Sequence, residues 1–85
     1  GYFAMPVLHA GHLVARVDPA REKGTLVAKR VTLEVTSAGT PVRGAIDGTA
    51  RALQEASSWV GADRIRVDEV VPSSAARSLR SAVSH

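Results

Sequence analysis

Two stretches near the start of the chain, YFAMPVLHAGHLVARVD at 2–18 and GTLVAKRVTLEV at 24–35, divide into two alternating sets of side chains, such as Leu13, Ala15 and Val17 against His12, Val14 and Arg16. A period of two places successive side chains on opposite faces of a strand, so the pattern predicts strands over 2–9, 12–18 and 25–35. The short Ala10-Gly11 turn favours a tight antiparallel hairpin between the first two strands. The side chains predicted to be buried on the third strand are Val27, Val31, Leu33 and Val35.

Two features interrupt this alternation. Lys29 falls in the same alternating set as the apolar residues Val27 and Val31. We expect it either to lie where the apolar face meets solvent or to mark a bulge. The segment from Asp18 to Gly24 contains Asp-Pro and ends in glycine, which predicts a polar loop between the second and third strands.

The spacing changes to that of a helix after a connector at 36–41 that is rich in Ser, Thr, Gly and Pro. Apolar side chains recur every three or four residues over 42–60, and Gly61 is suited to end the helix. The stripe comprises Ile46, Thr49, Ala50, Leu53, Ala56 and Val60. Asp47 and Arg51 have the spacing of an i,i+4 ion pair.

Trp59 lies at the end of this predicted helix. We expect it to close the core between helix and sheet, and an anchor that faces a partner is the alternative.

A fourth strand is predicted over 64–71, followed by Pro72 and a short helix that Ser73 or Ser74 could cap. The order β-β-β-α-β-α predicts an α+β fold, a small, mostly antiparallel sheet with one amphipathic helix packed on one face. Since 85 residues form one core at most, we expect a single domain over 1–85. The chain has 14 alanines and one each of Trp, Tyr, Phe and Met, so its side chains remove little area from water and a neighbouring domain would add to the core. We therefore expect it to be one domain of a longer protein.

The composition limits the class of protein. The chain has no cysteine, which excludes disulfides and thiolate metal sites and fits a cytoplasmic location. Its net charge of +3 and pI near 10.2 favour acidic partners such as nucleic acid. No apolar run approaches the roughly 20 residues of a membrane span.

No catalytic or metal-binding motif is present in the sequence. His9 and His12 bracket a turn and His85 is terminal, too few ligands for a metal site. The glycines match no phosphate-binding loop, and no nucleophile motif occurs. We therefore expect a fragment that is not an enzyme and binds no metal or cofactor.

Basic residues are the remaining candidates for a binding site. They gather around the predicted loop at 18–24 and its flanking strands, where they could contact a phosphate backbone without reading bases. The candidates are Arg16, Arg21, Lys23 and Arg30, with Lys29 beside them. The alternative is that these charges only keep a turn and its strands soluble.

The order of several short segments resembles a known family. These segments are Pro6-Val7-Leu8-His9, Gly11 to Asp18 (G-x-L-V-x-R-V-D), Gly24 to Val27, Leu33-Glu34 and, after the helix, Gly61 to Arg64 (Gly-Ala-Asp-Arg). Over about 2–68 the chain resembles the C-terminal domain of bacterial winged-helix DNA-binding-domain-containing proteins. That family includes the crosslink-unhooking and azinomycin-resistance DNA glycosylases.

The resemblance implies excision of alkylated or crosslinked purines from DNA by winged-helix modules that precede this region. The family's catalytic motif, two glutamines separated by one residue, has no counterpart here because the chain contains only Gln54. From this resemblance we expect a non-catalytic C-terminal accessory domain, the C-terminal fragment of a longer protein, that packs on winged-helix modules of its parent chain and contacts double-stranded DNA through a basic loop. The alternative is a structural interaction or dimerisation module with no nucleic-acid contact.

Overall fold

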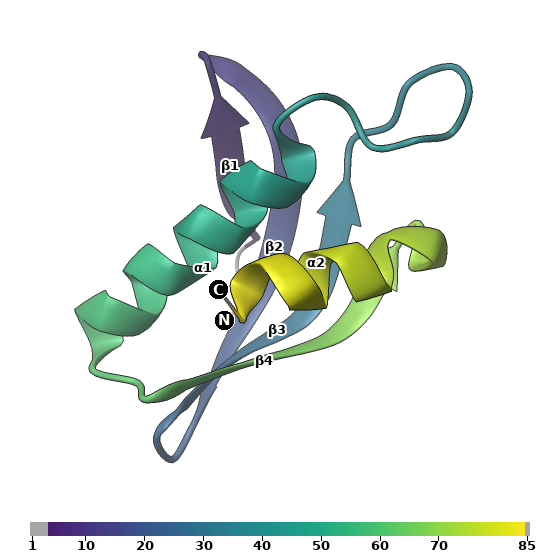
Figure 1. Cartoon of the computed structure of the whole chain (residues 1–85). Coiled ribbons are helices and arrows are strands. Elements are labelled where there is room, and N and C mark those ends of the chain that lie inside the picture. The colour runs from purple at the N-terminus through teal and green to yellow at the C-terminus, as the bar shows by residue number, and fades with distance from the viewer. Residues whose placement is uncertain (1–3, 85) are drawn as a thin grey trace.

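The computed structural model describes residues 4–84, so the predictions that involve Tyr2, Phe3 and His85 lie outside the described residues. The predicted α+β class and element order are confirmed (Figure 1). The elements are β1 (Met5–His9), β2 (His12–Glu22), β3 (Thr25–Leu33), α1 (Ala45–Val60), β4 (Arg64–Val71), the 3-10 turn η1 (Ser73–Ala75) and α2 (Ala76–Val83).

The four strands form one sheet in the order β1-β2-β3-β4. The first three pair antiparallel, whereas β4 lies parallel to β3. A parallel pair needs a crossover, and α1 supplies it. The turn between β1 and β2 is as tight as predicted, with positive φ at both Ala10 (52°) and Gly11 (81°).

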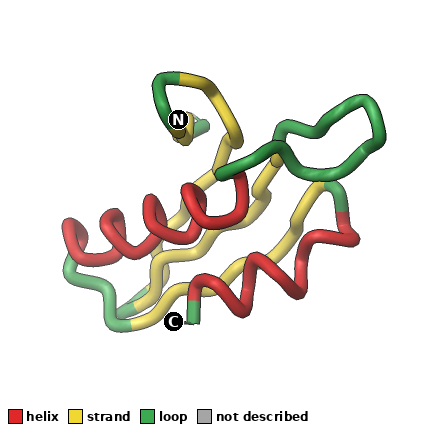
Figure 2. The backbone as a smooth tube through the Cα atoms, turned by 45° about the horizontal axis from the view of Figure 1, so that its top comes forward, coloured by secondary structure: helices red, strands yellow, loops and turns green. Residues whose placement is uncertain are grey.

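Both helices lie on the same face of the sheet (Figures 1 and 2). Helix α1 contacts all four strands, and α2 contacts β4 and α1. One apolar core fills the space between the layers, with Val17, Val31, Leu53 and Leu79 fully buried in it. Gly61 ends α1 as predicted, and its N–H donates to the carbonyls of Ser57 and Ser58. Its positive φ of 69° turns the chain so that the N–H of Ala62 also donates to the carbonyl of Ser57, at 2.9 Å.

Strand β2 is longer than predicted, since it continues through Pro19 to Glu22 and leaves only Lys23 and Gly24 in the turn. The register shifts at this point, where Asp18 pairs with Arg30 but Pro19 pairs with Ala28. Lys29 is thus the extra residue of a β-bulge, the second of our two expectations for it. The bulge lets the ladder continue past a proline, which has no N–H to donate.

Three side-chain predictions are wrong. Trp59 does not close the core, because it is 89% exposed. Val35 is 46% exposed, since β3 ends at Leu33 and the chain turns away through a bridge between Val35 and Pro41. No ion pair joins Asp47 and Arg51, two residues within the described range.

The last helix also begins differently from the prediction. No serine side chain caps η1 or α2. Instead, the N–H of Ala75 donates to the carbonyl of Pro72 at 3.0 Å, and the 3-10 turn leads directly into α2.

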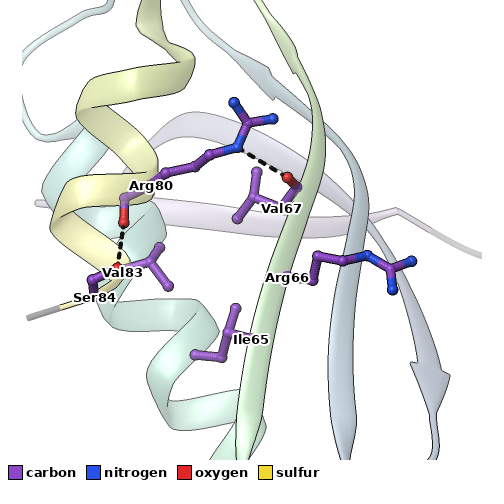
Figure 3. A pocket seen from close by; sticks show the side chains of 6 residues that line it. All are labelled: Ile65, Arg66, Val67, Arg80, Val83 and Ser84. Carbon is purple, nitrogen blue, oxygen red and sulfur yellow. Dashed lines mark hydrogen bonds between the residues drawn. The ribbon is translucent and has the colours of Figure 1, made fainter.

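Arg80 on α2 covers part of the outer edge of β4. Its Nε donates to the carbonyl of Val67 at 3.1 Å and its Nη2 to that of Asp68 at 2.7 Å. Figure 3 shows Arg80 on the helix side of β4, with Arg66 pointing away on the other side. An edge strand with unpaired carbonyls can pair with another chain, so this guanidinium protects the edge.

Candidate functional site

The tip of the β2–β3 hairpin lies against the turn between α1 and β4. The carbonyl of Gly24 accepts hydrogen bonds from the backbone N–H groups of Asp63 (2.9 Å) and Arg64 (3.2 Å). We call residues 21–24 together with 59–64 the hairpin end. It joins two segments that are about 40 residues apart in the sequence, in agreement with the pairing of Thr25 with Arg64.

Arg21 ties the hairpin to the helix. Its Nη2 donates to the carbonyl of Val60 at 2.8 Å. The last turn of α1 has no basic residue of its own, so Arg21 supplies the positive charge that favours a helix C-terminus. This predicted site residue therefore has a structural role at the hairpin end.

Lys23 and Arg64 are both exposed at the hairpin end. Neither side chain has a hydrogen bond or ion pair with another residue in the range 4–84. Trp59, which follows Glu55 by one helical turn, is also exposed there. The hairpin end thus presents two uncommitted cations and an indole to solvent.

Arg16 and Arg30 lie elsewhere, on strand positions away from the hairpin tip. Arg16 is exposed and pairs in the ladder with Pro6 and Thr32. From Lys23 it is seven residues along the chain, about 23 Å at the rise of a strand. Arg30 donates from Nε to Glu69 Oε1 at 2.8 Å, and this bond raises the pKa of Arg30. The four predicted site residues therefore do not form one cluster.

An ion-pair network around Arg66 crosses the sheet. Its Nη1 and Nη2 each lie 3.1 Å from the carboxylate of Glu22, and its Nε lies 2.8 Å from Asp68 Oδ1. The guanidinium of Arg66, on β4, thus crosses over β3 to reach Glu22 on β2. Val27, the residue of β3 that pairs with Arg66, is fully buried but does not belong to the core between the sheet and the helices. The network neutralises Glu22 and keeps Arg66 occupied.

The Asp68 carboxylate is expected to make stability depend on pH. The hydrogen bond from Arg66 lowers the pKa of Asp68. A lowered folded-state pKa stabilises the fold above the unfolded pKa of about 3.9, and the contribution is lost as pH falls through the folded value. We expect Asp68→Asn to be less stable than wild type at pH 6, with the two converging between about pH 4 and pH 2 in urea titrations.

Asp63→Asn is the matched control, because the Asp63 side chain has no ion pair within residues 4–84. A gap between Asp68→Asn and wild type that stays constant from pH 6 to pH 2 would contradict this assignment.

Several grooves in the range 4–84 are lined by titratable side chains. One groove between β4 and α2 is lined by Ile65, Arg66, Val67, Arg80, Val83 and Ser84 (Figure 3). A second groove along the same two elements contains the carboxylates of Asp68 and Glu69 beside Arg80. His9 and His12 pair across the first hairpin turn and line a further groove. His9 also lines a groove that contains Glu55 and Arg51. Within residues 4–84, no three His, Asp or Glu side chains are placed to hold a metal ion.

Comparison of the chain with protein-family models, curated proteins and solved structures finds no match. Neither helix in the range 4–84 has the length and apolar character that crossing a membrane requires.

Arg64 and Arg66 are not among the site residues predicted from the sequence. Both are close to the hairpin in space because β4 pairs with β3 in a parallel register. The alternation over 64–71 predicts the strand but carries no signal for its neighbour. The Gly-Ala-Asp-Arg segment that contains Arg64 contributes to the family resemblance, but it does not indicate that Arg64 lies beside Lys23.

Proposed function

We propose that this domain is a non-catalytic accessory domain of a DNA-binding or DNA-repair protein, and that it contacts the DNA backbone through the hairpin end. One observation carries the proposal: Lys23 and Arg64 lie on adjoining segments, exposed and without partners among residues 4–84. Cations that are already ion-paired would have to exchange one partner for another, whereas these two are available to phosphates.

The charge balance of the hairpin end supports the same proposal. Arg66 occupies Glu22, which leaves Asp63 as the carboxylate there without an ion pair in the described range. The resemblance of the sequence to the winged-helix family is the reason for choosing DNA among possible polyanions. It is also the reason for expecting winged-helix modules elsewhere in the parent chain.

Salt-dependent binding tests this proposal. In fluorescence anisotropy with a labelled duplex, the double variant Lys23→Ala/Arg64→Ala should bind more weakly at low salt. The fall of log K with log salt should also become less steep, by about 2 in the magnitude of the slope, because each of the two cations neutralises one phosphate.

Arg77→Ala is the matched control, since Arg77 is an exposed cation on α2 without an ion pair in the described part of the chain. It lies near the opposite end of β4 from Arg64. The double variant Arg77→Ala/Arg43→Ala removes the same charge as the test variant, and equal losses from the two double variants would exclude a localised site. Wild-type binding no tighter than that of an equally basic control protein would exclude direct DNA contact.

A further inference from the structure

Trp59 is the most exposed large apolar residue in the part of the chain that the structure describes. It is held on a fixed backbone, because the carbonyl of Val60 accepts from Arg21 and the N–H of Gly61 closes the last turn of α1. A tryptophan side chain has only two rotatable bonds, so on an ordered backbone it loses little conformational freedom on binding, and this favours its use as a contact residue.

The neighbours of Trp59 indicate which kind of partner it fits. Lys23, Arg64 and Arg21 lie at the same end of the molecule, and the carboxylate of Glu22 is neutralised by Arg66. A purely apolar partner surface would have to desolvate Lys23 and Arg64. A nucleic acid offers both an aromatic face for the indole and phosphates for the cations, which is the combination found in proteins that bind single strands.

We propose that Trp59 stacks on an unpaired nucleobase, so that the hairpin end binds single-stranded or locally unpaired DNA in preference to intact duplex. In a duplex the faces of the bases are covered by their neighbours, and an exposed indole gains little there. In a single strand each base has a free face, and stacking does not depend on the sequence. This inference rests on the proposed function, because the cations of the hairpin end bring the strand to the indole.

The chain offers a direct probe, since Trp59 is its single tryptophan. Oligothymidylate of about 12 nucleotides, within the range bound by single-strand proteins, is titrated against the domain at low salt while tryptophan emission is followed. Stacking should quench the emission. A duplex titrated under the same conditions should bind with much less quenching.

Variants separate stacking from charge. We expect Trp59→Ala to weaken oligothymidylate binding roughly 5- to 150-fold and duplex binding less than about 2-fold. Trp59→Phe should recover much of the loss because it retains an aromatic face. Leu8→Ala is the matched control, since Leu8 is an exposed apolar side chain (62%) on β1. Urea unfolding midpoints should be similar for all of these variants, because the altered side chains are exposed.

Three outcomes would overturn the inference. If DNA binds without quenching and Trp59→Ala binds as wild type does, Trp59 is not a stacking residue and the proposed function stands. If neither DNA binds above the level of a basic control protein, the proposed function fails together with the inference. If the wild type sediments as a dimer and Trp59→Ala as a monomer, the indole belongs to an interface between copies of the chain.

Discussion

Replacement of Leu53 by alanine is expected to lower the free energy of unfolding by about 2 to 5 kcal/mol. Leu53 is fully buried on the face of α1 that packs on the sheet. Its truncation removes apolar contacts and leaves a cavity that a small core can close only in part. Since a domain of this size has about 5 to 15 kcal/mol in total, the variant should lose a large part of its stability.

Thermal unfolding followed by circular dichroism measures this effect. The midpoint should fall by at least about 8 °C, given about 4 to 8 °C per kcal/mol for domains of this length. Leu8→Ala makes the same chemical change at an exposed site and should change stability by less than about 1 kcal/mol. Similar losses for the two variants would show that α1 does not pack as described.

Replacement of Gly44 by alanine is expected to cost about 2 to 3 kcal/mol, the second largest effect. Gly44 precedes α1 and has a φ of 82°, a backbone conformation that residues with a side chain rarely adopt. A Cβ atom there would also lie 2.5 Å from Cγ and 2.8 Å from Nε2 of His9, so the imidazole would have to move. The strain and the clash act together at this position.

Gly39 separates these two causes. Its φ is also 82°, but a Cβ atom there would meet nothing within 4 Å. Gly39→Ala should therefore cost only about 1 kcal/mol, the backbone contribution. In a His9→Ala background the excess cost of Gly44→Ala over Gly39→Ala should disappear, as urea unfolding of the double variants would report. If the excess persists, the His9 imidazole is not its cause.

The alternation of side chains is sufficient to predict the strands, because period two is a property of the backbone that tertiary contacts do not alter. It fails at Pro19, where a bulge at Lys29 carries β2 four residues further than predicted. The prediction for Trp59 is wrong for a different reason. Trp59 is six residues from Leu53, or 240° around a helix, so its angular position already points away from the core. Its hydrophobic character is a weaker guide to burial than that position.

The candidate site is only partly predictable. Arg21 and Lys23 are only two residues apart, so the sequence alone places them close together near the predicted turn. The approach of Arg64 to Lys23, and of Arg66 to Glu22, depends on which strand β4 joins and in which register. A single sequence carries no direct signal for a pairing of strands separated by a helix, so these cations could not be assigned to the hairpin.

The parallel pairing of β3 with β4 also determines what a growing chain exposes during translation. Residues 5–33 supply β1 to β3, but β3 keeps a bare edge until residues 64–71 have left the ribosome. That edge belongs to a strand that contains Leu26, Val27, Val31 and Leu33. Products that end before residue 64 would present it to one another as a template for intermolecular sheets. The last quarter of the polypeptide, from Arg64 onward, thus covers the edge of a strand made before it.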